Sequence, residues 1–572
     1  MTVLDAGGQY CHLIARRVRE LGVYAEVKPS ETPASELGGR KAVIVSGGPS
    51  SVYEPGSPTL DPAVFSLDAG ILGICYGQQL MAHLLSGHVR KGTRGEYGHA
   101  ILDVARAEGI LAGLARAEQV WMSHRDQVET PPPGFETIAS TETCPVAAIA
   151  DFAGRRYGVQ FHPEVVHTPA GQRILENFIF EVCGCQRDWD PRGRIGLLEN
   201  LIRNVAGERN VFFFVSGGVD SSVAYRLCLD ALGPDRVRGA YVDTGFMRQG
   251  ETEFVREALQ VDIVDARVEF LDALRGAVEP EAKRHIIGEQ FVLVQQRVLE
   301  QGHYLDREWI LGQGTIYPDT IESGGTARAD VIKTHHNRVP GIQKLIDDNR
   351  IIEPLSSFYK DEVREVGREL GLPAELLDRH PFPGPGLAIR LLCSSEAHAI
   401  ESTPEGWLVP VHSVGVQGDS RSYRPVLALD QPWTLERATA IVNATTRANR
   451  VIGLVGSHVP LSAMSVPAAT LTRERLERLR AADAAVRAIS HESGFDRRVW
   501  QFPVVLIPTG DAARPDSVVL RPIHSVDGMT AQAVVMDEAL RGRMCEALLG
   551  IEGVAAVFYD LTHKPPATIE WE

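Results

Sequence analysis

The segment NVFFFVSGGVDSS, residues 210–222, decides the fold of the centre of the chain. Its apolar run Val211–Val215 has no polar break, which is typical of a buried strand. A Ser-Gly-Gly turn and then a helix are expected over Ser216–Leu232. Because a second strand is expected over Val237–Val242, the segment opens a βαβ unit, and this pattern continues to about Arg390.

The turn of this unit has the composition of an anion-binding loop. Successive backbone N–H groups at a helix N-terminus bind phosphate, and glycines let the backbone approach its oxygens closely. Ser216, Ser221 and Ser222 add hydroxyl donors. Asp220 would repel phosphate unless a cation lies between them, so Mg²⁺ is predicted there. The turn is not the G-x-x-x-x-G-K-S/T loop of P-loop enzymes, and the alternative interpretation is a plain glycine turn.

The first part of the chain, residues 1–186, also alternates short apolar runs with helical patterns. The expected elements are a strand over Thr2–Leu4, a helix over Ala15–Leu21, and strands over Lys41–Val45 and Ala69–Ile74. Strands that alternate with helices predict a second parallel sheet, with ligands bound at the carboxyl ends of its strands. The polar stretch Gly184–Arg194 reads as a linker to the central unit.

A cysteine follows the last of these strands, in the stretch GICYGQQL at Gly73–Leu80. Cys75 comes directly after the apolar run and before helix-forming residues, so it is predicted at a helix N-terminus, where a thiolate is stabilised. Gly73 and Gly77 permit the sharp turn that this position requires. A thiolate nucleophile also needs a base and a group that orients the base.

Candidates for those two roles lie in YGVQFHPEV, Tyr157–Val165. His162 and Glu164 are expected at the end of a strand, where residues two apart share one face and a carboxylate can hold the imidazole in one tautomer. The amides of Gly48, in the loop VSGGPSSV, and of Tyr76 are predicted to form an oxyanion hole. The alternative interpretation is a core cysteine and a structural strand histidine.

Together these motifs resemble class I glutamine amidotransferases. The stretches that carry the resemblance are Ser46–Pro49, Gly73–Gln79 and Gly158–Val165. It implies that Cys75 attacks the side-chain amide of glutamine, that His162 and Glu164 complete the triad, and that ammonia is released. The residues implied to hold glutamine are Gln79, Ser123, His124 and Asp126. Arg125 departs from the glycine usual in that family, which bears on glutamine affinity or gating.

The Ser-Gly-Gly-Val-Asp-Ser-Ser run resembles the pyrophosphate loop of N-type ATP pyrophosphatases, which cleave ATP to AMP and diphosphate. Adenylation turns a poor oxygen leaving group into a good one that ammonia can replace. A second ATP-facing stretch is implied at Leu311–Ser323. The residues implied to bind ATP are Ser216, Gly217, Gly218, Val219, Asp220, Ser221, Ser222, Val242, Gln313 and Gly314, with Asp220 as the metal ligand.

Four further stretches resemble GMP synthetases, which suggests the acceptor of the ammonia. They are VIKTHHN (331–337), RHPFPGPGLAIR (379–390), VGVQGDSRSY (414–423) and KPPATIEWE (564–572). Lys333, Arg421 and Lys564 are cations suited to a monophosphate, although any one of them alone could be a solvated surface charge. The residues implied to meet the acceptor are Lys333, His335, His336, Pro383, Gly384, Arg421, Gln501, Lys564 and Glu570. Two residues depart from those of relatives. Arg328 stands in for the lysine usual in a mobile lid, which bears on the lid contacts, and His563 replaces a common serine beside Lys564, which bears on the acceptor preference.

The resemblance extends from Val3 to Glu572 and implies two doubly wound α/β domains followed by an α+β domain. The expected domains are an amidotransferase over 1–187, an ATP pyrophosphatase over 188–394, and an acceptor-binding and dimerisation domain over 395–572 with an inserted segment near 425–500. In the last domain, strands are expected over Trp407–Val414, Val499–Ile507 and Val554–Asp560, and helices over Leu435–Ala448 and Leu471–Ile489. A homodimer is implied by the resemblance alone.

Composition limits the other functional classes. The chain has 58 lysines and arginines against 74 acidic residues, a net charge of −16, which argues against non-specific nucleic-acid binding. It has neither an apolar run of about 18 residues nor a secretory leader, so a cytoplasmic protein is expected. Its eight cysteines are scattered, without the spacing of a zinc motif.

The sequence therefore predicts an enzyme that makes GMP from XMP, with ATP, Mg²⁺ and glutamine as the other reactants. Two alternatives stay open at this point. One is a paralogue that aminates a related purine nucleotide in specialised metabolism. The other is a catalytically silent nucleotide-binding regulator, against which the presence of Cys75, His162, Glu164 and Asp220 argues.

Overall fold

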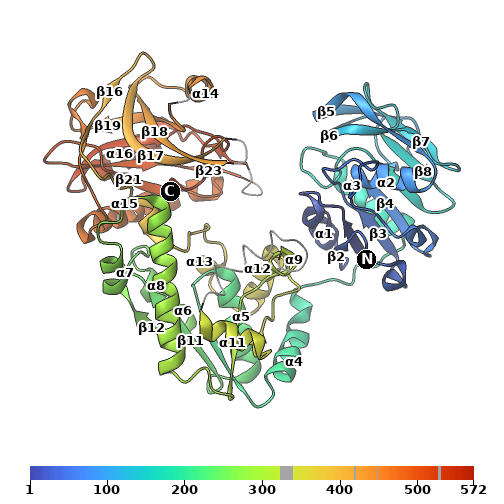
Figure 1. The fold of residues 1–572 in the computed structure, drawn as a ribbon, viewed down its shortest axis with the longest axis horizontal. Helices are drawn as coiled ribbons and strands as arrows, with labels where there is room; N and C mark the ends of the chain where they lie inside the picture. The colour runs from blue at the N-terminus through green and yellow to red at the C-terminus, as the bar shows by residue number, and fades with distance from the viewer. Residues whose placement is uncertain (323–338, 418–419, 446, 526–529) are drawn as a thin grey trace. The chain divides into compact units, whose positions relative to one another are not determined.

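The computed structural model of the chain describes residues 1–322, 339–417, 420–445, 447–525 and 530–572 (Figure 1). The residues divide into two compact units. The first consists of Met1–Arg194 with a short segment that starts at Tyr317, and the second of Ile195–Ile316 with the C-terminal remainder. In the described part of the chain, no helix combines the length and apolarity needed to cross a bilayer.

The first unit is built on a nine-stranded sheet in the order β2-β1-β3-β4-β9-β8-β7-β5-β6. Its parallel half comprises β2 (Glu26–Pro29), β1 (Thr2–Asp5), β3 (Ala42–Val45), β4 (Gly70–Ile74) and β9 (Arg156–Val159). Its antiparallel half adds β8 (Ala148–Asp151), β7 (Glu136–Ser140), β5 (His88–Val104) and β6 (Ala117–Thr130). The strands expected from the sequence all lie in the parallel half, and β2 was not among them.

Helices of this unit are α1 (Cys11–Glu20), α2 (Tyr76–Leu84) and α3 (Gly171–Glu176), and α9 (Tyr317–Glu322) belongs to its short second segment. The three strands and the one helix that were expected up to residue 74 are present as β1, β3, β4 and α1. Apolar side chains of β3, β4 and α2 form a core whose members include Val43, Ile71 and Leu80. The carboxyl ends of the parallel strands therefore lie at one edge of a rigid sheet, where ligands of doubly wound folds bind.

The second unit begins with a five-stranded parallel sheet in the order β12-β11-β10-β13-β14. The strands are β10 (Asn210–Phe214), β11 (Val237–Asp243), β12 (Asp262–Asp265), β13 (Trp309–Gly312) and β14 (Ile351–Ile352). The helices are α4 (Ile195–Ala206), α5 (Val219–Leu232), α6 (Glu251–Leu259), α7 (Arg267–Ala273), α8 (Pro280–Gln301), α11 (Pro340–Asp347), α12 (Lys360–Glu369) and α13 (Ala374–Leu377). The strand order reverses at β10, which creates the crevice used for ligands in such sheets.

The C-terminal part of the second unit holds a mixed seven-stranded sheet in the order β16-β17-β18-β19-β25-β22-β21. The strands are β16 (Glu401–Ser402), β17 (Trp407–Gln417), β18 (Ser420–Leu429), β19 (Arg450–Ser457), β25 (Val554–Asp560), β22 (Asp516–Leu520) and β21 (Val504–Ile507). Two short pairs accompany it, β15 (His398–Ala399) with β20 (Ser465–Val466), and β23 (Ile523–His524) with β24 (Gln532–Ala533).

Helices α14 (Leu435–Ala444), α15 (Arg473–Glu492) and α16 (Glu538–Leu549) complete this α+β part, and α15 and α16 pack on the sheet (Figure 1). One continuous apolar core joins this sheet to the parallel one. Its members include Phe246, Leu387, Leu427 and Val504. The two sheets of the second unit are consequently fixed to each other by shared packing.

The glycine turn and helix expected over Ser216–Leu232 are present: Gly217 has a φ of +72°, which only a turn accepts, and the helix begins at Val219. Two other expected boundaries differ. The strand expected over Val499–Ile507 is confined to β21, and the helix expected to reach Ala448 ends at Ala444.

Candidate active site

Cys75 lies in the tight turn between β4 and α2. Its φ of +53° is a sparsely populated conformation for a residue with a side chain and costs about 1–3 kcal/mol. Two glycines make the turn feasible, since a Cβ on Gly73 would lie 2.5 Å from the Gly77 backbone and one on Gly77 would lie 2.3 Å from the carbonyl oxygen of Val45. The thiol is buried at the N-terminus of α2, 3.7 Å from the carbonyl oxygen of Ser123.

His162 and Glu164 meet in the same unit, with 2.7 Å between His162 Nδ1 and Glu164 Oε1. Both side chains are buried. Because β9 ends at Val159, the two residues lie in the following turn, and the expectation that they share a strand face is wrong. The turn is held instead by hydrogen bonds: the His162 amide donates to the Trp121 carbonyl at 3.0 Å, and the Thr168 hydroxyl donates to the His162 carbonyl at 2.7 Å.

The electrostatic surroundings of His162 favour its protonated form by raising its pKa. Burial alone lowers the pKa of His162, but the Glu164 carboxylate and the contact with Cys75 outweigh it and raise the pKa well above 6.5. An imidazolium next to a cysteine favours the thiolate form of that cysteine. The arrangement thus combines a nucleophile, a proton donor and a carboxylate that orients the donor.

Glu164→Gln is expected to lower glutamine-dependent turnover by about 10²–10⁴-fold, because the neutral amide no longer stabilises the imidazolium. A raised histidine pKa stabilises the folded state fully below about pH 6.5, and this contribution is lost as the pH rises through the raised value. The difference in Tm between the protein and the variant should therefore be largest below pH 6.5 and shrink above it. Glu176→Gln on α3 is the control, and equal turnover in both variants would contradict the assignment.

The loop Ser46–Gly48 lies against Cys75 and His162. A Cβ at Gly47 would be 3.1 Å from His162 Cε1 and 3.5 Å from Cys75 Cβ. A Cβ at Gly48 would be 2.4 Å from the Ala6 carbonyl oxygen and 3.4 Å from the Tyr76 ring. The two residues predicted to form the oxyanion hole, Gly48 and Tyr76, therefore lie side by side next to Cys75, and the backbone of Ala6 leaves room only for glycine at position 48.

Gln160 was missed by the sequence analysis, although it belongs to the YGVQFHPEV motif. Its side-chain nitrogen donates to Cys75 Sγ at 3.5 Å, and its oxygen accepts from Gln79 Nε2 at 3.2 Å. Gln79 Nε2 also donates to the carbonyl of Asp126 at 2.8 Å. Gln79 thereby connects the helix after Cys75 to strand β6. A polar side chain two residues before His162 was the available signal for Gln160.

The predicted glutamine-binding residues Ser123, His124 and Asp126 all lie on β6. Ser123 is exposed, whereas His124 and Asp126 are buried. Asp126 Oδ2 accepts from the Tyr53 hydroxyl at 2.9 Å, a partner that the sequence did not suggest. Both nitrogens of the His124 ring are engaged, one with Glu96 and the other with the Asp126 carbonyl. A contact between position 124 and bound glutamine would therefore use the backbone of His124. Arg125 is exposed on the same strand.

The predicted phosphate loop, Ser216–Ser222, connects β10 to α5 as expected. The Ser216 and Ser221 hydroxyl oxygens are 3.0 Å apart, and the Gly218 amide donates to Ser216 Oγ at 3.2 Å. The Ser222 hydroxyl donates to the Gly218 carbonyl at 2.7 Å. These bonds hold a compact loop with Val219 at the first position of the helix, which is the geometry of an anion-binding helix N-terminus.

The second predicted ATP stretch lies directly on this loop. A Cβ at Gly314 would be 2.6 Å from the backbone nitrogen of Ser221, so only glycine allows the approach. The Gln313 amide donates to the Ile352 carbonyl at 3.0 Å, which fixes the segment at the end of β13. Val242 lies near the end of β11, on the other side of β10. All the predicted ATP residues thus gather at the carboxyl edge of one parallel sheet.

Asp220 lies in the first turn of α5 and pairs with Lys360, with 3.3 Å between Lys360 Nζ and Asp220 Oδ2. Lys360 begins α12 and was not predicted, because nothing near it in the sequence marks it. A carboxylate in the first turn of the helix that follows an anion-binding loop is an oxygen ligand that fits Mg²⁺ shared with phosphates. A lysine at the same place adds a positive charge toward an anion.

Two predicted acceptor residues meet in the second unit. Gln501 Nε2 donates to the Pro381 carbonyl at 2.9 Å and to Glu570 Oε1 at 3.3 Å. Arg390 binds Glu570 through two hydrogen bonds of 2.9 and 2.7 Å, and its guanidinium lies 5.2 Å from the ring centroid of Phe382. Arg390 was quoted in a motif but given no role. The Arg390–Glu570 ion pair links the segment after α13 to the C-terminal residues.

Arg390→Met is expected to destabilise the fold by about 3 kcal/mol, the lower end of the range for a buried pair, because the half-buried Glu570 carboxylate loses its fully buried partner. Burial raises the pKa of Glu570, but Arg390 lowers it below 4.5 overall, so the pair stabilises the fold at neutral pH and this is lost as the pH falls through the lowered value. Adding Glu570→Leu should recover most of the loss in urea unfolding. Independent, additive losses would show that the pair is not coupled.

Other predicted acceptor residues are placed differently or lie outside the described residues. Lys333, His335, His336 and the departure Arg328 lie outside them. Arg421 lies on β18 opposite Val416, and Lys564 forms an isolated bridge with Ala531. The Pro383 carbonyl accepts a hydrogen bond from the Gly386 amide at 2.9 Å. A Cβ added at Gly384 would have no other atom within 4 Å. His563 Nδ1 accepts from the Ala533 amide at 3.1 Å, so its ring helps to hold β24.

The first unit combines a buried cysteine at a strand–helix turn with a His–Glu pair, and the second carries a loop at a helix N-terminus on its parallel sheet. A family model described as glutamine amidotransferase class-I matches residues 2–182, and one described as GMP synthase C terminal domain matches residues 488–571. The first of these matches identifies the first unit as a glutamine amidotransferase.

Curated relatives extend this likeness to the whole chain. A "Probable GMP synthase (glutamine-hydrolyzing)" of Leptospira interrogans is 41% identical over 601 residues, covering 100% of this chain and 99% of the relative. The GMP synthases (glutamine-hydrolyzing) of Bifidobacterium longum and Caldicellulosiruptor saccharolyticus are each 40% identical, covering 100% of this chain and 96% and 99% of the relatives. The chain belongs to the family of glutamine-hydrolysing GMP synthases.

Proposed function

We propose that the protein converts XMP, ATP, glutamine and water to GMP, AMP, diphosphate and glutamate. One observation carries this proposal: the chain is similar to GMP synthases over its whole length, and it has the residues of both chemical centres. One centre is the Cys75–His162–Glu164 set, and the other is the Ser216–Ser222 loop. No feature of the described residues favours the paralogue or the silent regulator over this activity.

In the first half-reaction, the Cys75 thiolate attacks the side-chain amide carbon of glutamine. The oxyanion that forms would accept hydrogen bonds from the amides of Gly48 and Tyr76. His162 donates its proton to the leaving nitrogen, so ammonia departs and a thioester remains. Water then cleaves the thioester, with His162 as the base, and releases glutamate. Gln79, Ser123, His124 and Asp126 are proposed to position glutamine.

In the second half-reaction, the loop Ser216–Ser222 binds the phosphates of ATP. Gly314 packs closely against the Ser221 backbone of this loop. A bound Mg²⁺, held by Asp220, would neutralise the charge of the diphosphate that leaves. The C2 oxygen of XMP attacks the α-phosphorus, which forms adenylyl-XMP and diphosphate. Ammonia then attacks C2, and AMP leaves with the oxygen. Lys360 is suited to stabilise the phosphate charge, because it lies beside Asp220.

The finer features of the proposal come from the family likeness. Gln501 and Glu570 would meet the purine, and Lys333, Arg421 and Lys564 the phosphate, with His335, His336, Pro383 and Gly384 as further contacts. We propose three domains, 1–187, 188–394 and 395–572. A homodimer and a cytoplasmic location remain predictions from the sequence.

The direct test is release of diphosphate from ATP with XMP or IMP as the acceptor. We expect release with XMP at least about 10²-fold above that with IMP, because IMP has no C2 oxygen to adenylate and the site's polar groups would stay unpaired. GMP should form in equal amount. Release that is indifferent to XMP would exclude the proposed reaction and favour another purine acceptor.

A further inference from the structure

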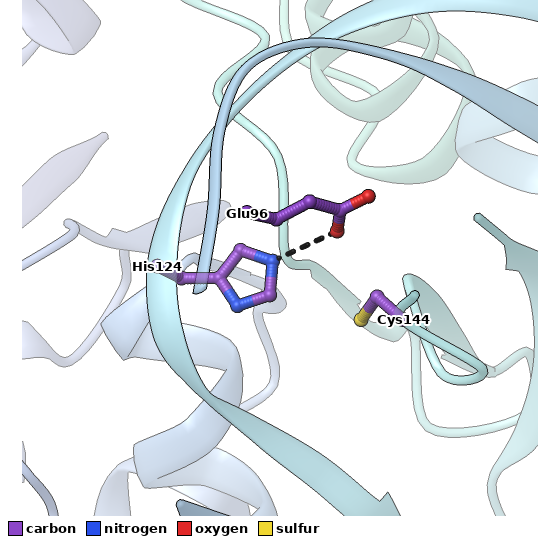
Figure 2. Close-up of side chains that lie close together, drawn as sticks. All are labelled: Glu96, His124 and Cys144. Atoms are coloured by element: carbon purple, nitrogen blue, oxygen red, sulfur yellow. Dashed lines mark hydrogen bonds and ion pairs between the residues drawn. The ribbon is translucent and has the colours of Figure 1, made fainter. Parts of the chain in front are cut away.

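The side chains of Glu96, His124 and Cys144 form a cluster in the first unit (Figure 2). The proposed reaction uses only the backbone of His124, so these three side chains have no role in it. One potential ligand atom from each lies within 4.8 Å of the others. They come from β5, from β6 and from the turn between β7 and β8. His124 and Cys144 are buried and Glu96 is half-buried, so the cluster is not a set of solvated surface charges.

The hydrogen bonds of His124 determine which ring nitrogen carries its lone pair. Nδ1 lies 3.0 Å from the Asp126 carbonyl oxygen, which can only accept, so Nδ1 carries a hydrogen. In the neutral ring, Nε2 is then an acceptor, and it faces Glu96 Oε2 at 3.2 Å. Two acceptors at this distance repel each other unless a cation lies between them. That cation is either a proton or a metal ion.

Both ligands already have the outer contacts that metal ligands carry. Metal-binding histidines donate their other ring N–H to a carbonyl or carboxylate, as His124 does to Asp126. Ligating carboxylates are in turn hydrogen-bonded, and the Thr141 hydroxyl donates to Glu96 Oε1 at 2.8 Å. The same Thr141 oxygen accepts from the Cys144 amide at 3.0 Å, which anchors the turn that presents the sulfur.

The ligand chemistry selects the metal. A thiolate, an imidazole and a carboxylate are the ligands that Zn²⁺ prefers, with a water able to take the fourth position. Ligand atoms around a tetrahedral zinc lie about 3.3–3.7 Å apart. The His124–Glu96 distance of 3.2 Å is close to this already. Since no pair exceeds 4.8 Å, the sulfur needs to approach by roughly 1 Å on binding.

We propose that Glu96, His124 and Cys144 bind one Zn²⁺ per chain. The ion would cross-link β5 and β6 to the β7–β8 turn. Because Ser123 and Asp126 flank His124 on β6, the same ion would hold the strand that carries the proposed glutamine contacts. The inference stands on the cluster's own geometry, so it can hold whether or not XMP is the acceptor.

The test is metal binding by the full-length protein after dialysis against a chelator. Zn²⁺ is added and its bound stoichiometry measured, and Co²⁺ is used as a spectroscopic probe, whose thiolate charge-transfer band reports the Cys144 sulfur. The measurements are made in a Cys75→Ser background, because Cys75 and His162 are themselves metal ligands by chemistry. We expect one Zn²⁺ per chain and a thiolate–Co²⁺ band.

Cys144→Ala in that background should abolish the band and weaken Zn²⁺ binding at least about 100-fold. Glu96→Gln, at a half-buried position, should weaken binding without loss of fold. Cys183→Ala, another buried cysteine of the same unit, should bind as the parent does. Absence of Zn²⁺ binding, or equal binding in the Cys144 and Cys183 variants, would overturn the site and leave a shared proton between His124 and Glu96.

Discussion

Cys75→Ala is expected to reduce glutamine-dependent GMP formation by at least about 10³-fold, while ammonia-dependent formation stays within about twofold of the unaltered protein. The thiol is the only side-chain nucleophile that the strand–helix turn presents to His162, and loss of a nucleophile removes the covalent route entirely. The second proposed centre lies on a separate sheet, so its proposed chemistry needs only free ammonia. The measurement is GMP formation with glutamine or with ammonium at high pH as the nitrogen source.

The control for this variant is Cys183→Ala, which removes a buried thiol from the same unit without touching the turn. It should retain both activities. The Cys75 variant should also be folded, because alanine is accommodated wherever cysteine is; circular dichroism and Tm check this. Unchanged glutamine-dependent activity would remove Cys75 from the mechanism, and loss of both activities would mean that the two centres are not separable.

Features determined by local sequence were predictable. The turn at Cys75 and the loop at Ser216 each combine an apolar strand, glycines and a helix start, so sequence neighbours settle their geometry. Glycines in such turns also predict places where other atoms come too close for a side chain. Gly73 and Gly217 are in such places, since a Cβ on either would clash with a neighbour. The α/β class follows from the same alternation, and the structure confirms it with two sheets whose parallel strands carry both centres.

Contacts between distant segments were not predictable in this way. Lys360 reaches Asp220 across 140 residues, and Arg390 reaches Glu570 across 180. A charged residue on a helix or in a loop has the same local pattern whether it is solvated or paired, so only the tertiary fold distinguishes the two cases. The cluster of Glu96, His124 and Cys144 was missed for the same reason, because its ligands lack the short spacing of zinc motifs.

The antiparallel half of the first sheet also escaped prediction. Strands β5 and β6 are long and irregular, with register shifts between Lys91 and Glu96, and they carry many exposed polar residues. Such strands lack the continuous apolar runs that identify buried parallel strands. Their position nevertheless bears on the proposed glutamine site, because β6 carries Ser123, His124 and Asp126, and the Ser123 carbonyl oxygen lies 3.7 Å from Cys75 Sγ.

Asp220→Asn is expected to lower diphosphate release by at least about 10²-fold with either glutamine or ammonium as the nitrogen source. The substitution keeps the shape of the loop but removes the carboxylate that would hold Mg²⁺ next to the phosphates. Lys360 then faces the phosphates without its partner carboxylate, so ATP binding should weaken much less than turnover. The measurement is XMP-dependent diphosphate release as a function of Mg²⁺, in which the variant should need a higher Mg²⁺ concentration.

Asp230→Asn is the matched control, since it makes the same change in the last turn of the same helix. Asp230 pairs with Arg226 at 2.9 Å near the surface, and such pairs contribute only about 0–1 kcal/mol. Its activity should stay within about twofold of the unaltered protein. If Cys75→Ala spares ammonia-dependent synthesis and Asp220→Asn does not, as expected, the two variants together assign nitrogen release and acceptor activation to different sheets. Diphosphate release by Asp220→Asn equal to that of Asp230→Asn would place the metal elsewhere.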